Sequence, residues 1–191
     1  MRTSDIVNTF AWVHVDQAKK LRDLARRNAH LENSWLLDRR AALGLGENEP
    51  TPEHIRIEML TLRPDNWPGE SLMVTAAMRR RMAEAPLAGT WPPFTDQERA
   101  AQRLAGRRPG TPDEHFGDKF ALDLPADLVS AAQLAAHRLS EPVVAKLHAE
   151  NLIGSGRSRS KKSVTRRLEL QGQIWTLGRV IRESITMIVG T

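Results

Sequence analysis

A stretch rich in proline and glycine interrupts this chain of 191 residues and most restricts its fold. Five prolines lie between residues 86 and 118: Pro86, Pro92, Pro93, Pro109 and Pro112. Proline ends helices and is kept out of central strands, so continuous secondary structure is not expected there. We therefore interpret residues 1–85 as an N-terminal helical module, residues 86–118 as a connector and residues 119–191 as a C-terminal module. No internal repeat stands out.

The N-terminal module reads as mainly helical. Apolar residues at helical spacing predict one long helix or two nearly collinear helices over residues 4–43, with Ser4 as the N-cap. Alternation in HIRIEMLTL predicts a strand over residues 54–62, and residues 70–85 predict a second helix. The first helix carries a basic face that is either solvated or part of a dimer-forming hairpin: Lys19, Lys20, Arg22, Arg26, Arg27, Arg39 and Arg40.

The connector and the C-terminal module contain shorter signals. Thr95 and Glu98 have the spacing of a capping box, which predicts a short helix from Thr95 to Ala105. KFALDL, from Lys119, alternates like a strand, and Pro125 opens a helix. Ser140 is expected to cap a second helix, and residues after 163 read as strand-to-helix or as helix alone. The fold class expected is mainly α with minor β.

Composition narrows the functional class. The absence of cysteine excludes disulfides, thiol catalysis and zinc fingers built on cysteine. Lys and Arg number 28 against 23 Asp and Glu, a net charge of +5, which suggests a polyanionic partner. Neither a secretory signal nor a membrane-spanning stretch is present, so we expect a cytoplasmic protein without a membrane partner. The Ala- and Arg-rich composition is typical of a bacterial or phage protein.

The basic run GSGRSRSKKSVTRR is the clearest binding signal. Six cations occur before the next acid at Glu169: Arg157, Arg159, Lys161, Lys162, Arg166 and Arg167. Serines between them can donate to phosphate oxygens, and Gly154 and Gly156 allow close approach of the backbone. We interpret the run as a loop that contacts a nucleic-acid backbone; the alternative is a solvated loop without a ligand.

The segment LAAHRLSEPVVAKLHAENLI, residues 134–153, precedes that run. Ala135 is the small residue that two crossing helices need, Leu139 an apolar plug for the turn, and Val144 and Leu147 anchors for the second helix. Over residues 126–170 the sequence resembles helix-turn-helix DNA-binding proteins, and its continuation resembles a winged helix. The resemblance implies that the second helix enters the major groove of double-stranded DNA and that the basic loop is the wing. The groove-facing residues implied are Glu141, Val143 and Lys146, with His148 beside them.

A second resemblance uses overlapping residues. KFALDLPADLVSAAQ is similar to the strand and first helix of ribbon-helix-helix proteins, which implies that Lys119, Ala121 and Asp123 face bases. An ordinary helical hairpin remains the plain alternative to both.

Catalytic signals are weak. The six histidines lack metal-ligand spacing, and neither a catalytic constellation nor a cofactor is expected. Asp113, Glu114 and Asp118 allow a metal-dependent nuclease as an alternative.

The function predicted is that of a DNA-binding transcriptional regulator or plasmid-maintenance factor, acting as a homodimer or with a protein partner through its N-terminal helix. The other alternative is a basic subunit of a ribonucleoprotein or virion assembly.

Overall fold

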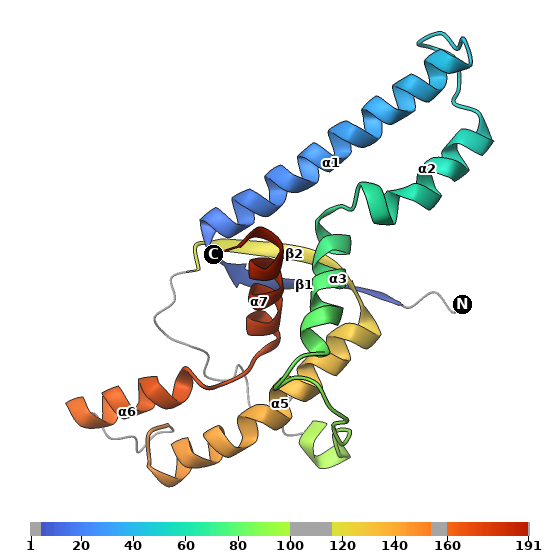
Figure 1. Cartoon of the computed structure of the whole chain (residues 1–191). Coiled ribbons are helices and arrows are strands. Elements are labelled where there is room, and N and C mark those ends of the chain that lie inside the picture. Colours follow the sequence, from blue (N-terminus) through green and yellow to red (C-terminus); the bar gives the residue numbers. More distant parts are fainter. Residues whose placement is uncertain (1–4, 100–115, 154–159, 191) are drawn as a thin grey trace.

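A two-stranded antiparallel sheet lies at the centre of the molecule, and the rest of the described chain is mainly helical (Figure 1). The structure is a computed structural model that describes residues 5–99, 116–153 and 160–190. β1, Ile6–Val13, pairs along its whole length with β2, Asp118–Pro125, so that Ile6 lies opposite Pro125. The alternation that predicted a strand from Lys119 is confirmed by β2.

The first strand replaces the start of the long helix expected over residues 4–43. β1 alternates: Ala11 and Val13 are buried, whereas Phe10 and Trp12 lie on the exposed face. Apolar and aromatic residues of this kind pack well on a pleated surface. The predicted helix is correct only from Val15 onward, and Ser4 lies outside the described residues.

The helices beyond β1 have well-defined limits. They are α1 Val15–Ala42, α2 Glu53–Asn66, α3 Glu70–Met82, α5 Ala126–Ala149, α6 Lys161–Gln171 and α7 Leu177–Val189. The helix predicted over residues 70–85 is confirmed by α3, apart from its last turn.

The strand expected over residues 54–62 is wrong, because these residues belong to α2. Ile55 is buried and Met59 and Leu62 are half-buried, whereas Ile57 and Leu60 are exposed. Positions i, i+4 and i+7 form one face of a helix. Ile55 and Met59 fit both this helical pattern and the alternation of a strand, which is why the sequence predicted a strand here.

Thr95 and Glu98 form the predicted capping box. The Glu98 amide donates to the Thr95 hydroxyl at 3.2 Å, and the Thr95 amide donates to the Glu98 carboxylate at 2.6 Å. Residues 96–99 are helical, and the rest of the helix predicted to Ala105 lies outside the described residues.

The two halves of the chain repeat one arrangement, a strand followed by a long helix, a shorter helix and a 13-residue helix. Residues 6–82 contain β1, α1, α2 and α3, and residues 118–189 contain β2, α5, α6 and α7. Buried residues correspond as well: Met73, Val74, Ala77 and Met78 of α3 match Val180, Ile181, Ser184 and Ile185 of α7. The sequence analysis did not detect this repeat.

The halves share one core. α3 packs against β2 and α7 against β1, while α3 and α7 pack against each other beneath the sheet. Leu21 of α1 and Ala132 of α5 are buried in the same cluster. The segments on either side of the predicted connector therefore share a sheet and a core. The α1–α2 pair and the α5–α6 pair extend from it in opposite directions (Figure 1).

The turn expected before Ser140 is absent, because Ala126–Ala149 is one helix. The Ser140 side chain is buried and caps nothing. Its hydroxyl accepts from the Trp175 amide at 2.8 Å and lies 2.7 Å from the Ala136 carbonyl. Pro142 is tolerated inside the helix, although it has no amide hydrogen to donate to the Arg138 carbonyl. Ser140 thus ties the segment before α7 to α5.

Candidate nucleic-acid interface

The C-terminal part of α5 and α6 form a helical arm with a small core of its own, which we call the α5–α6 arm. Leu147, Leu152, Leu170 and Ile174 are buried together, and Val143 packs against them. This cluster is separate from the main core beneath the sheet. α6 begins at the end of the arm distant from the sheet and runs back toward α7 (Figure 1).

The outer end of α6 carries positive charge. Ser160 is its N-cap and accepts from the Ser163 amide at 3.2 Å. Lys161 and Lys162 follow in the first turn, which contains no acid, and both side chains are exposed. Neither lysine has an ion-pair partner among the residues that the structure describes. The positive end of the helix dipole adds to these charges, so this end favours an anionic ligand.

The other basic residues of the run differ in their surroundings. Residues 161–167, expected in a loop or wing, are helical. Arg166 is engaged by Glu150 at 3.1 Å and Glu169 at 3.4 Å, and its hydrogen bonds lower the pKa of the Glu150 carboxyl. Arg167 is half-buried. Arg157 and Arg159 lie outside the described residues.

The residues predicted to enter a DNA groove differ in their exposure and contacts. Lys146 and His148 are exposed near the end of α5. Val143 is half-buried in the small core of the arm, so its side chain is not presented to a ligand. Glu141 is exposed but bound to two neighbours, Arg138 and His137. Val143 and Glu141 therefore both make contacts within the protein, and their base-reading role stays a prediction.

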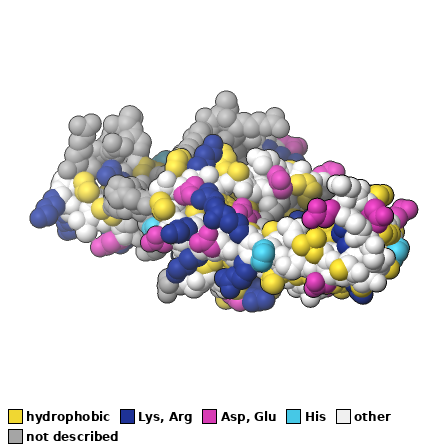
Figure 2. Space-filling model, turned by 90° about the horizontal axis from the view of Figure 1, so that it is seen from above, with side chains coloured by type: hydrophobic (Ala, Val, Ile, Leu, Met, Phe, Trp, Pro, Cys, Tyr) yellow, Lys and Arg dark blue, Asp and Glu magenta, His cyan; other side chains and the backbone are white. Residues whose placement is uncertain are grey.

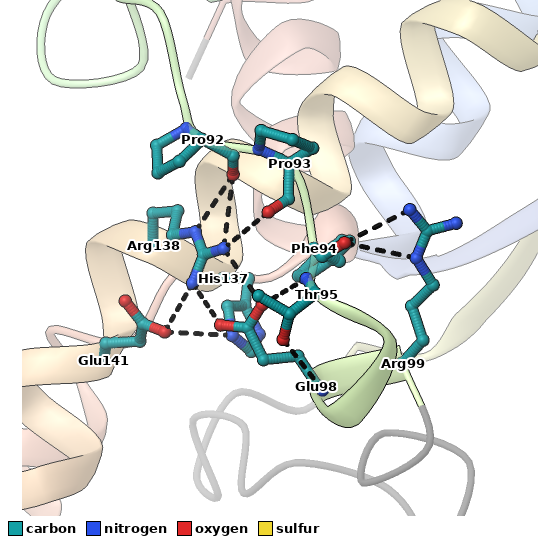
Figure 3. Close-up of polar contacts among 9 residues, drawn as sticks. All are labelled: Pro92, Pro93, Phe94, Thr95, Glu98, Arg99, His137, Arg138 and Glu141. Atoms are coloured by element: carbon teal, nitrogen blue, oxygen red, sulfur yellow. Dashed lines mark hydrogen bonds and ion pairs between the residues drawn. The ribbon is translucent and has the colours of Figure 1, made fainter.

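Arg138 is the centre of the cluster that holds Glu141 (Figure 3). Its guanidinium donates to Glu98 at 2.5 Å, to Glu141 at 2.8 Å and to the Pro93 carbonyl at 3.0 Å. Hydrogen bonds from Arg138 lower the pKa of Glu98 to about 2. Because Arg138 comes from α5 and Glu98 from residues 96–99, this cluster fastens the proline-rich connector to the second half of the chain.

The same cluster has the ligand types of a metal site. Ligand atoms of Glu98, His137 and Glu141 lie within 4.8 Å of one another. The Arg138 guanidinium, however, already contacts both carboxylates and supplies the positive charge that a metal would bring. A metal would have to displace a cation that is itself held by the connector backbone. We therefore interpret the cluster as an ion-pair network.

The residues considered for a nuclease are not gathered either. Asp118 accepts two hydrogen bonds from Arg22, at 2.6 Å and 3.2 Å, which lower the pKa of its carboxyl. Both carboxylate oxygens are therefore occupied by a guanidinium. Asp113 and Glu114 lie outside the described residues. Lys119, Ala121 and Asp123 lie on the exposed face of the sheet, where Asp123 accepts a hydrogen bond from Asn8 at 2.9 Å.

A groove between α1 and α7, with a volume of about 990 Å³, was not indicated by the sequence. Lys19 and Lys20 line it from α1, and Arg179 and Arg182 line it from α7. Lys and Arg side chains gather over the N-terminal half of α1, with Asp and Glu among them (Figure 2). The sequence showed the basic face of α1, but nothing in it joined that face to arginines some 160 residues further along.

Comparison of the chain with protein-family models, with curated proteins and with solved structures gave no match. Among the described residues, helices long and apolar enough to cross a membrane do not occur.

Proposed function

We propose that this protein binds nucleic acid in the cytoplasm through the α5–α6 arm. The observation that supports this best is the outer end of α6, where Lys161 and Lys162 are exposed, lack ion-pair partners among the described residues and follow a serine N-cap. Phosphate groups are the common anions that such a helix end attracts. Lys146 adds a third exposed cation on α5.

Double-stranded DNA and a role as a bacterial or phage transcriptional regulator or plasmid-maintenance factor remain our prediction for the partner. The resemblance to helix-turn-helix and winged-helix proteins now needs a different helix, because α5 continues through Ser140. α6 follows α5 after residues 150–160 and has its basic end outermost, so we assign to α6 the role of the helix that enters the groove.

The proposal is tested by charge reversal at α6. Lys161→Glu combined with Lys162→Glu should weaken binding to a fluorescein-labelled 30-base-pair DNA duplex about tenfold or more at 0.1 M salt. The matched control is a double reversal of exposed arginines elsewhere, Arg56→Glu with Arg80→Glu, which makes the same change in net charge on α2 and α3. Equal loss in both double variants, or no binding by the wild type, would overturn the proposal.

Non-specific binding within a ribonucleoprotein or virion assembly is the second candidate. The ion pairs of Arg166 and Glu141 favour it, because they remove side chains that base reading would use. Selection from a random duplex pool separates the two functions. A regulator should enrich one sequence that binds about a thousandfold more tightly than random DNA, whereas equal binding of all sequences supports the assembly subunit.

A partner chain is also part of the proposal. The α1–α2 pair exposes several large apolar side chains at a distance from the main core: Leu31, Leu37, Leu43, Ile57 and Leu60. Exposed apolar groups concentrated on one projecting element are typical of protein contacts. We propose that a second copy of this chain or another protein packs here.

A further inference from the structure

One face of the two-stranded sheet carries apolar side chains that the described helices leave uncovered. The opposite face is buried, and Phe120, Leu122 and Leu124 of β2 lie there in the main core. On the uncovered side, Phe10 is 51% exposed and Trp12 is 38% exposed. This side, which we call the open sheet face, is formed by every second residue of both strands: Ile6, Asn8, Phe10, Trp12, Lys119, Ala121, Asp123 and Pro125. Apolar side chains gathered on one exposed face are typical of a surface that another molecule covers.

Two opposite charges lie on the open sheet face, and both belong to β2. The ammonium of Lys119 lies 4.2 Å from the centre of the Phe10 ring. Asp123 accepts a hydrogen bond from the uncharged Asn8 amide at 2.9 Å. Neither charge has an ion-pair partner among the residues that the structure describes. The face therefore offers one positive and one negative group to whatever covers it.

The positions of these two charges make the face complementary to itself. Ala121 lies midway between Lys119 and Asp123, and the strand register places Phe10 opposite Ala121. Two sheets can pack face to face with their strands roughly aligned. If a two-fold axis lies between two such faces and crosses the strands at Ala121, the second copy runs in the opposite direction. Lys119 of each copy then lies over Asp123 of the other, and the two Phe10 rings meet near the axis.

Asp123 also distinguishes a second copy from nucleic acid as the occupant of this face. A phosphate backbone would be repelled by this carboxylate, which has no cationic partner among the described residues. A second copy instead brings Lys119 to it, and the exposed rings of Phe10 and Trp12 become buried at the same time. Complementary charges of this kind fix the register in which two surfaces meet.

We infer that two copies of this chain associate through their open sheet faces, with Lys119 of each copy paired to Asp123 of the other. This inference goes beyond the proposed function, because it depends neither on nucleic-acid binding nor on the apolar α1–α2 pair. Eight side chains from each copy are fewer than the roughly 20–30 residues of a standard stable interface. The dimer should therefore be weak and should form in a concentration-dependent manner.

Charge exchange tests the pairing, and sedimentation velocity over a series of protein concentrations measures it. Lys119→Glu places two acids opposite each other at both ends of the interface, so it should weaken the dimer about tenfold or more. Asp123→Lys should weaken it similarly by opposing two lysines. Arg80→Glu on α3 makes the same change in net charge as Lys119→Glu and should leave the dimer unchanged.

Two rescue experiments show whether the charges act between copies. The double variant Lys119→Glu with Asp123→Lys should dimerise within about threefold of the wild type, because every acid again faces a lysine. An equal mixture of the two single variants should also dimerise, since the two copies then carry opposite charges at both contacts. A change confined to the fold of one copy would not be repaired by mixing. Both substituted side chains are exposed, so circular dichroism should match the wild type.

The contrary outcomes are equally definite. A wild type that sediments as a monomer at every concentration up to about 1 mM would overturn the inference. So would a dimer that neither the double variant nor the mixture restores. Lys119→Glu that weakens binding to the fluorescein-labelled duplex while association stays unchanged would assign the open sheet face to nucleic acid instead. The proposed function is tested separately, by the duplex affinity of the variant changed at Lys161 and Lys162.

Discussion

Arg138 connects segments of the chain that lie far apart in sequence. It sits three residues before Glu141 on α5 and reaches Glu98 and the carbonyls of Pro92 and Pro93 in the connector. A guanidinium has five donors in a planar fork, so it can satisfy several acceptors at once. This explains why Glu141, which the sequence suggested for a DNA groove, faces an arginine instead.

Acid should loosen the connector. The pKa of Glu98 falls from 4.5 when unpaired to about 2 beside Arg138. The stabilisation is thus complete above pH 4.5 and is lost as the pH falls from 4.5 toward 2. In urea unfolding, Glu98→Gln should be less stable than the wild type at pH 7, and this difference should shrink at pH 2.5. A difference that stays constant across this range would show that the ion pair does not stabilise the fold.

Ser140 should matter for packing. Ser140→Ala removes a buried hydroxyl that accepts from the amide of half-buried Trp175. Leaving a buried donor without a partner costs about 1–3 kcal/mol. Urea unfolding should show a loss of this size, whereas Ser130→Ala, an exposed serine on the same helix, should change the stability little. Equal effects at the two serines would mean that the hydrogen bonds of Ser140 contribute nothing.

At the level of elements, the sequence predicted those whose signals are local. The capping box of Thr95 and Glu98, the strand from Lys119 and helix α3 were all found. β1 was missed because its side-chain pattern makes sense only beside β2, more than 100 residues away. The break at Ser140 was predicted from Ser and Pro142, yet burial of Ser140 against Trp175 overrides that local preference.

For the candidate sites too, the sequence predicted only those features whose signals are local. Lys161, Lys162 and Lys146 could be selected from sequence because charge runs are visible there. The ion pair of Arg166 with Glu150 spans 16 residues, and the groove joins α1 to α7, so neither could be read from local sequence.

The α5–α6 arm should open independently of the main core. Leu147→Ala creates a cavity in the small apolar cluster, and such changes cost about 2–5 kcal/mol. Amide hydrogen exchange in α6 should therefore speed up, while exchange in α3 and α7 stays near the wild-type rate. Uniformly faster exchange in α3 and α6 would contradict an independent arm. Duplex binding should weaken in parallel with the loss of α6 protection.

At the scale of the whole molecule, two similar halves around one sheet produce two arms with different surfaces. The α1–α2 pair exposes leucine and isoleucine, whereas α6 exposes lysine at its outer end. The repeat supplies the framework, and these differences between its halves are the basis for the proposed division into a protein-contact arm and an anion-contact arm.

Oligomeric state should depend on the apolar arm. Leu37, 64% exposed on α1, is the most exposed of its large apolar side chains. If a second copy packs there, Leu37→Glu should shift the protein from dimer to monomer in light scattering after gel filtration, since a buried unpaired charge opposes association. A wild type that is monomeric at all concentrations would leave another protein as the partner of this arm.

The salt dependence of duplex binding tests most directly whether the chain binds a phosphate backbone. Each neutralised phosphate contributes about −0.9 to the slope of log K against log salt concentration. With Lys146, Lys161 and Lys162 in contact, the wild-type slope should be about −3, and it should flatten by about 2 when Lys161 and Lys162 are both changed to Glu. Binding that does not change with salt, or a slope identical in wild type and variant, would contradict the account.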